Sequence, residues 1–381
     1  MQLNRLRALL DRLPEIGVPG CACIVRQHGE TIFLHRAGVR DLDTKEALRE
    51  HDHFFLYSAS KLATCTAALQ RLEAGDFLLT DPVGAYLPAF RDMTVRHILK
   101  TGAFYEEKAK NSITIRHLFT MTAGLDYNLQ TPAIQAAIHE SGGRAPTQVI
   151  AAAIAQTPLS FEPGTHWQYS LCHDVLAALV EVVSGERFSD YVRRHIFEPC
   201  GMTESAYHLT PELEASLATQ YRYDTEQKKA LPAGQKNDYI LGPDYDSGGA
   251  GIISTLEDYS LFVDALCHWG RAATGEQILS PRSVELMRTN TLNETCLRDK
   301  DWPQLAGYGY GLGVRTMIDP ALGGSLSPVG EFGWDGAAGA YMVIDPEHEL
   351  SLFYVQHLLN CSHAYIHPRI RNTMYADLNE R

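Results

Sequence analysis

Hydrophobic and polar positions follow patterns that predict strands near both ends of the chain. Two short β-rich runs, 21–25 and 31–34, flank a glycine-containing turn at 28–30, which is typical of a hairpin. Strand-like runs return near the other end, at 308–315, 340–344 and 350–356. We therefore expect one sheet that is completed by the two ends of the chain.

Between these strands the apolar residues recur mostly at helical spacing. The segment 58–73 places leucines and a cysteine on one helical face, and Gly75 supplies a stop. Further helical patterns lie at 3–13, 147–156, 171–183, 188–197 and 255–268. The polar stretch 222–238 indicates an exposed connection. These patterns predict a mainly helical domain, 58–240, inserted into a sheet-containing domain made of 1–57 and 241–381.

Composition and charge narrow the classes of partner. Of the 381 residues, 45 % are hydrophobic and 21 % charged, as in globular proteins with a large core. The formal net charge of -13 repels nucleic acid and anionic lipid surfaces. No apolar run approaches the ~20 residues that span a bilayer, and the charged N-terminal segment is typical of an amphipathic helix rather than a secretory signal. We expect a cytoplasmic protein with no nucleic-acid partner and no membrane insertion.

The cysteines and histidines give no sign of a metal centre. The eight cysteines form no Cys-x-x-Cys pair, and we interpret them as reduced thiols of the core. His51 and His53 form a His-x-His, but no second group follows at the spacing of a zinc site. We therefore expect ordinary structural histidines, no metal and no cofactor.

A Ser-x-x-Lys motif, Ser58-Ala59-Ser60-Lys61, stands where the first long helical pattern begins. Three residues along a helix bring Lys61 onto the face of Ser58, within reach of its hydroxyl. A helix cap is the simpler interpretation of Ser58, yet a capping box has Glu or Gln where Lys61 stands. A lysine in a first turn faces the positive end of the helix dipole, and desolvation also lowers a lysine pKa. Lys61 is therefore a candidate base for a serine nucleophile.

Two further segments carry candidate chemistry. Tyr169 lies in a turn, 163–171, that leads into a helical pattern. Its phenol is either a packing group or, if nearby positive charge lowers its pKa, a relay for a serine proton. The glycine-rich segment 333–339 precedes a predicted strand, where small residues permit close backbone approach. An N–H group there is either part of a simple glycine turn or a donor in an oxyanion hole.

In this order, the Ser-x-x-Lys, Tyr-Ser-x and x-x-Gly motifs resemble those of the serine β-lactamase and penicillin-binding protein superfamily, class C-like branch. The resemblance covers most of the chain and includes the stretches 115–125, 248–255 and 308–313. It implies that Ser58 is the acylated nucleophile, Lys61 its base partner and Tyr169 a proton relay. It also implies an oxyanion hole from the backbone N–H groups of Ser58 and Ala337. The implied fold is α+β: an antiparallel sheet flanked by helices, plus a helical domain, with the site between them.

Two departures from the β-lactamase pattern concern the substrate. Leu171 replaces the Asn of Tyr-Ser-Asn, so an amide that would contact a β-lactam or peptide is lost. Trp334-Asp335-Gly336 replaces Lys-Thr-Gly, which removes a cation for a substrate carboxylate, and an ionised Asp335 would repel that carboxylate. Family VIII carboxylesterases and related acyltransferases carry a Trp in this triplet and a Tyr-Ser-…-Asp-Val-Leu pattern, found here at 169–176. We therefore expect these substituted positions, Leu171, Trp334, Asp335 and Gly336, to shape a site for uncharged substrates.

The sequence thus predicts a serine hydrolase that forms an acyl-enzyme on Ser58 and acts on small neutral esters. Three alternatives stay open at this point. A β-lactamase or D-amino-acid peptidase would use the same nucleophile, an acyltransferase would pass the acyl group to another acceptor, and a binding module would use the scaffold without catalysis.

Overall fold

The computed structural model describes residues 3–378, in which a seven-stranded sheet is built from both ends of the chain. Every neighbouring pair in this sheet is antiparallel, in the order β2-β1-β13-β12-β11-β10-β9. Its strands are β1 (Gly20–Gln27), β2 (Glu30–Gly38), β9 (Tyr308–Tyr310), β10 (Arg315–Met317), β11 (Phe332–Gly333), β12 (Tyr341–Asp345) and β13 (Leu350–Gln356). The predicted α+β class with an antiparallel sheet is confirmed.

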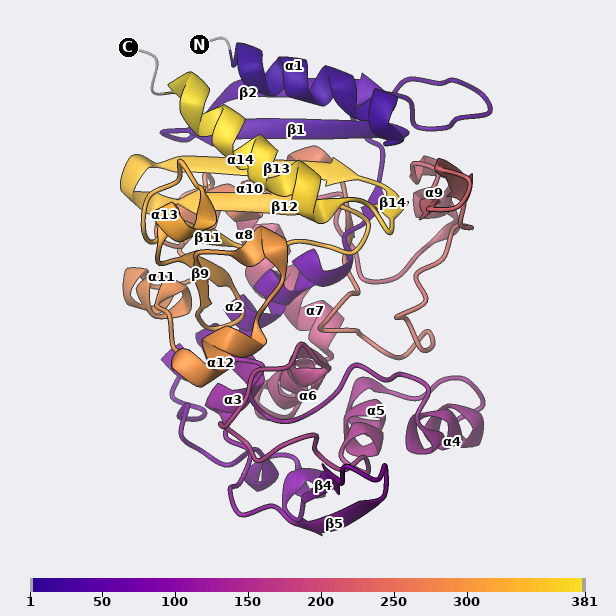
Figure 1. Cartoon of the computed structure of the whole chain (residues 1–381), viewed down its shortest axis with the longest axis vertical. Helices are drawn as coiled ribbons and strands as arrows, with labels where there is room; N and C mark the ends of the chain where they lie inside the picture. The colour runs from indigo at the N-terminus through magenta and orange to yellow at the C-terminus, as the bar shows by residue number, and fades with distance from the viewer. Residues whose placement is uncertain (1–2, 379–381) are drawn as a thin grey trace.

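Alternating side chains on β1 bury the two faces of the sheet against different helices. Cys21, Cys23 and Val25 pack under α1 (Asn4–Arg12) and α14 (His363–Leu378), which lie side by side in Figure 1. Ala22 and Ile24 point to the opposite face, which is covered by α10 (Leu256–Cys267). The two ends of the described chain therefore close one side of the sheet together.

The helical half of the molecule centres on α2 (Ser60–Glu73) and α6 (Cys172–Ser184), which pack against each other. Figure 1 shows this pair between the sheet and the helices α4 and α5 at the far end. The other helices are α3 (Ile115–Phe119), α4 (Pro132–Glu140), α5 (Thr147–Ile154), α7 (Phe188–Val192), α8 (Glu198–Cys200), α9 (Pro211–Ser216), α11 (Pro281–Arg288), α12 (Glu294–Asp299) and α13 (Pro320–Gly323). The smaller strands are β3 (Phe54–Phe55), β4 (Thr94–Ile98), β5 (Phe104–Lys108), β6 (Tyr221–Asp224), β7 (Lys229–Pro232), β8 (Ile253–Ser254) and β14 (Leu358–Leu359).

Two predicted elements are corrected by the structure. The strand expected at 308–315 is a pair, β9 and β10, because the chain turns at 311–314. Gly313 makes this turn with φ +86°, and a Cβ there would lie 2.1 Å from the sulfur of Cys65. The exposed connection expected at 222–238 contains the β6–β7 hairpin, whose first strand pairs with β14. The domain boundaries themselves stay a prediction.

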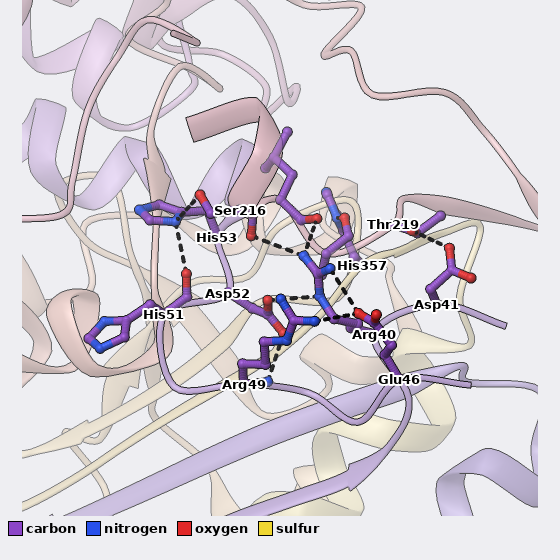
Figure 2. Close-up of polar contacts among 12 residues, drawn as sticks. Arg40, Asp41, Glu46, Arg49, His51, Asp52, His53, Ser216, Thr219 and His357 are labelled. Carbon is purple, nitrogen blue, oxygen red and sulfur yellow. Dashed lines mark hydrogen bonds and ion pairs between the residues drawn. The ribbon is translucent and has the colours of Figure 1, made fainter. Parts of the chain in front are cut away.

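Polar contacts anchor the segment that leads into β3, as Figure 2 shows. Arg40 donates from Nε to Asp52 at 2.9 Å and from Nη2 to the Leu217 carbonyl at 2.9 Å. The buried His53 ring contacts the hydroxyl of Ser216 at 2.8 Å. These bonds fix the chain just ahead of Ser58. Among the helices of residues 3–378, none combines the length and apolarity needed to cross a bilayer.

Candidate active site

Ser58 lies in a tight turn, Tyr57–Ala59, between β3 and α2. Tyr57 adopts a left-handed conformation with φ +48°, which costs a residue other than glycine of order 1 kcal/mol or more. Its hydroxyl donates a hydrogen bond to the side chain of Gln220, and its ring packs edge-on against Tyr239 at 5.8 Å. Packing on both ends of the Tyr57 side chain thus holds the strained turn that presents Ser58.

Lys61 is fully buried in the first turn of α2, beside Ser58. Its Nζ lies 3.2 Å from the Ser58 hydroxyl, 2.7 Å from the carbonyl of Gly249 and 3.1 Å from the hydroxyl of Tyr127. The spacing of the Ser-x-x-Lys motif therefore does bring the two side chains together. The Gly249 and Tyr127 oxygens aim the amine at Ser58.

Tyr169 lies in the loop before α6, and its phenol contacts the hydroxyl of Ser58. Its phenol shares a hydrogen bond with Ser58 and accepts one from Nε1 of Trp334 at 3.3 Å. Burial raises the pKa of Tyr169, and the hydrogen bonds with Ser58 and Trp334 oppose this only in part. The expectation that nearby positive charge lowers this pKa is wrong, because desolvation dominates. Lys61 Nζ lies over the face of the Tyr169 ring, 4.8 Å from its centroid. Tyr169 therefore meets Ser58 as a neutral phenol.

Asp174, Tyr127 and Lys61 converge around Gly249. A Cβ on Gly249 would lie 2.6 Å from a carboxylate oxygen of Asp174, 3.1 Å from the Tyr127 hydroxyl and 3.2 Å from Lys61 Nζ. The other Asp174 oxygen accepts hydrogen bonds from the hydroxyl of Tyr245 at 2.6 Å and from the backbone N–H of Gly249 at 3.2 Å. Asp174 therefore holds the turn whose carbonyl binds Lys61, and only glycine leaves room for this approach.

The glycine-rich segment 333–339 brings Ala337 next to Ser58. A Cβ on Gly336 would lie 2.2 Å from the carbonyl oxygen of Leu56, so the two backbones touch two residues before Ser58. Within residues 3–378, the backbone N–H groups of Ser58 and Ala337 donate to no backbone carbonyl. Both residues line the same cavity, which is the arrangement that two donors of an oxyanion hole require.

The cavity over Ser58 has a volume of about 540 Å³ and walls that are rich in aromatic side chains. Its lining residues are Ser58, Tyr127, Tyr169, Tyr239, Trp302, Pro303, Gln304, Asp335, Ala337 and His363. Of the positions predicted to shape the substrate site, Asp335 lies in this wall. Trp334 is 1 % exposed and Leu171 2 % exposed, so both are core side chains, and Leu171 lines a separate small cavity beside Leu125. Gly336 is buried and acts through its backbone.

Comparison with known proteins agrees with this geometry. A family model described as Beta-lactamase matches residues 6–371. The chain belongs to the beta-lactamase family. Protein Rv1367c of Mycobacterium tuberculosis is 29 % identical over 94 % of this chain and 90 % of its own length. Esterase EstB of Burkholderia gladioli is 27 % identical over 91 % of this chain and 88 % of its own length. The structure of EstCE1, "a hydrolase with promiscuous acyltransferase activity", superimposes with a TM-score of 0.78, 25 % identity and 97 % coverage of both chains.

Membership of the beta-lactamase family confirms the resemblance found in the sequence, including the relationship to esterases of this superfamily, and the chain is a serine hydrolase. Asp174 belongs to the Tyr-Ser-…-Asp-Val-Leu pattern at 169–176, which by itself indicates no role for this residue. The site also contains residues that the motifs did not reveal, namely Tyr127, Tyr239, Trp302 and His363. Tyr127 follows the family-like stretch 115–125 by two residues, which was a usable signal. Trp302 and His363 lie on segments with no such motif. Residues 3–378 hold no group of three or more His, Cys, Asp or Glu arranged to bind a metal ion.

Proposed function

We propose that this beta-lactamase family protein is a carboxylesterase that forms an acyl-enzyme on Ser58 and acts on small neutral esters. The observation that carries the proposal is the position of the Ser58 hydroxyl between Lys61 Nζ, at 3.2 Å, and the phenol of Tyr169, at the floor of an aromatic cavity. The relationship to Esterase EstB supports the same class of reaction.

Acylation follows from these contacts. The Ser58 oxygen attacks the ester carbonyl carbon while its proton passes to the amine of Lys61, which becomes an ammonium. The carbonyl oxygen becomes an oxyanion that the backbone N–H groups of Ser58 and Ala337 stabilise. The neutral Tyr169 gives its proton to the leaving alcohol as the bond between that alcohol and the carbonyl carbon breaks, and the Lys61 ammonium returns a proton to Tyr169. The product is an ester between the acyl group and Ser58.

Deacylation uses the same groups in reverse. Water takes the place of the alcohol, loses a proton to the amine of Lys61 and attacks the acyl carbon. The Ser58 oxygen then leaves and regains its proton, which releases a carboxylic acid. No cofactor takes part in either half of this cycle.

The wall of the cavity supports substrates without negative charge. Burial acts to raise the pKa of Asp335, but the contact with His367 at 3.5 Å and the charge of Arg315 hold this pKa below its ordinary value. An ionised Asp335 repels a substrate carboxylate. Trp334 stands where β-lactamases of the class C-like branch carry a lysine, so the cation for such a carboxylate is missing.

A substrate panel tests the proposal. We expect purified protein to hydrolyse nitrophenyl esters of short acids, and Ser58→Ala to reduce kcat at least about 10³-fold. A fluorophosphonate probe should label the wild type at Ser58 and leave Ser58→Ala unlabelled. Strong turnover of a chromogenic cephalosporin or of D-amino-acid amides, with no ester cleavage, would instead favour the β-lactamase or peptidase alternative. Absence of both turnover and labelling would leave only a binding function.

Acyl transfer is a second candidate, supported by a second cavity of about 380 Å³ that shares Tyr127, Tyr239 and Ala337 with the first. An acyl group in one cavity leaves the other for an acceptor alcohol, which then competes with water. The promiscuous acyltransferase activity of the structural relative EstCE1 supports the same chemistry. Adding primary alcohols to the ester assay and measuring the ratio of new ester to free acid distinguishes transfer from hydrolysis.

A further inference from the structure

Asp335 places a carboxylate among aromatic rings in the wall of the Ser58 cavity. Its side chain is 14 % exposed, and it shares the cavity with the rings of Tyr127, Tyr169, Tyr239 and Trp302. Tyr169 stacks on Tyr127 at 5.4 Å and meets Trp302 edge-on at 5.3 Å, so these rings form a continuous surface. A carboxylate beside aromatic faces is the surrounding that quaternary ammonium groups prefer.

Two of these rings already face an amine group. Lys61 Nζ lies 5.2 Å from the ring centroid of Tyr127 and 4.8 Å from that of Tyr169. Lys61 is fully buried and donates to the Gly249 carbonyl, so its amine stays at the floor beside Ser58. The upper wall contains Trp302 and Asp335, and the residues that line the cavity include no lysine or arginine.

The groups around Asp335 hold its carboxylate in place. His367 lies behind it, with Nδ1 3.5 Å from the carboxylate and its side chain only 3 % exposed. The ring of His363 stacks on His367 at 4.7 Å and lines the cavity. Burial lowers the pKa of His363 to about 4, so this imidazole is neutral at pH 7 and does not compete as a cation. The nearby Arg315 is paired with Glu331 at 3.3 Å.

We propose that the cavity selects esters that carry a quaternary ammonium or protonated amine group, which Asp335 and the ring of Trp302 bind while Ser58 attacks the ester. The inference rests on the proposed esterase function and adds a substrate class to it. The net charge of -13 also attracts cationic substrates towards the protein.

Isosteric substrates that differ only in charge test this inference. Acetylcholine and 3,3-dimethylbutyl acetate carry the difference in the alcohol. The ethyl esters of 4-(trimethylammonio)butyrate and 5,5-dimethylhexanoate carry it in the acyl group. At pH 8 and fixed ionic strength, we expect kcat/KM to be roughly tenfold higher for the cationic member of at least one pair, as one carboxylate and one cation–π contact allow. Equal or lower values for the cation in both pairs overturn the inference.

Variants separate the cavity carboxylate from general surface charge. Asp335→Asn should bring the cationic-to-neutral ratio to about one, and Asp335→Glu should restore part of the preference. Asp301→Asn is the matched control, because it removes one negative charge from an exposed residue adjacent in sequence to Trp302. Its ratio should equal that of the wild type. A ratio that Asp335→Asn leaves unchanged contradicts the proposal.

Binding without turnover distinguishes failure of this inference from failure of the esterase proposal. Tetramethylammonium chloride, titrated by calorimetry against sodium chloride of equal ionic strength, should bind the wild type and bind Asp335→Asn at least about fivefold more weakly. If no ester is hydrolysed but tetramethylammonium binds in this Asp335-dependent way, the cation site stands and the esterase proposal falls. If neutral esters are hydrolysed and tetramethylammonium does not bind, the cation site falls alone.

Discussion

The backbone of Gly336 touches the carbonyl of Leu56, so that a Cβ at position 336 would lie 2.2 Å from that oxygen. This contact joins the segment that leads out of β11 to the segment that leads into Ser58. Ala337 follows directly, and the two expected oxyanion donors therefore keep their separation only while this approach is possible.

Replacing Gly336 by alanine should separate these segments. We expect Gly336→Ala to lower kcat/KM for a nitrophenyl ester about 10²-fold, because the loss of a well-placed oxyanion donor costs that much. Gly234→Ala is the control, since Gly234 also belongs to a loop but has open space around its Cα, with φ +79°. It should cost stability through strain and leave kcat unchanged. Equal activity losses in both variants would contradict the role given to Gly336.

Removing one phenol at a time should distinguish the two tyrosines at Ser58. Tyr169→Phe removes the hydroxyl that contacts Ser58, and we expect kcat to fall 10²–10⁴-fold, the range for a lost general acid or base. Tyr127→Phe removes a hydroxyl that contacts Lys61 instead, so a smaller fall of roughly tenfold is expected. Circular dichroism checks that both variants fold. A larger loss for Tyr127→Phe would reverse the assignment of the proton relay.

Asp174 should matter more for activity than for stability. Asp174→Asn weakens the bonds that hold the Gly249 turn against Lys61, and we expect a fall in kcat of at least about tenfold with a loss of 1–3 kcal/mol in the free energy of unfolding. Asp264→Asn is the matched control, because Asp264 is also buried but bonds to Ser351 of the sheet at 2.8 Å. It should cost similar stability with little change in kcat. If kcat fell equally in Asp174→Asn and Asp264→Asn, the effect of Asp174 would be on folding alone.

The pH dependence of the free energy of unfolding should include a contribution from protonation of the buried His357, which is labelled in Figure 2. Its Nδ1 donates to the Ala218 carbonyl at 2.8 Å and its Nε2 accepts from the Phe55 N–H at 3.3 Å, so the folded state binds the neutral ring. Burial lowers the pKa of His357 to about 4, against about 6.5 in the unfolded chain. The stability that this residue contributes is present above pH 6.5 and is lost as the pH falls towards 4.

Urea unfolding measures this loss. Between pH 7 and pH 5 we expect His357 to account for a decrease of about 2 kcal/mol in the free energy of unfolding. In His357→Gln the amide can make the same two hydrogen bonds and does not titrate, so the slope of stability against pH should be shallower over this interval. An unchanged slope would show that His357 is protonated in the folded protein or that other groups dominate.

Local patterns predicted the parts of the site that depend on neighbouring residues. Helical spacing was enough to place Lys61 on Ser58, and the glycines of 333–339 were enough to indicate close backbone approach. The position of Trp302 depends on how a loop packs against Tyr169, and no period in the sequence records this contact. The pKa of Tyr169 was predicted in the wrong direction, because the degree of burial is a property of the tertiary structure.

Pairing of β1 with β13 has a consequence for protein synthesis. A ribosome delivers Ser58 early, but β12 and β13, the strands that follow Ala337, emerge much later. Translation products that end before residue 337 therefore contain the nucleophile without the second oxyanion donor. Esterase activity should therefore appear only after β12 and β13 have joined β1 in the sheet. Fragments released by premature termination should not hydrolyse esters.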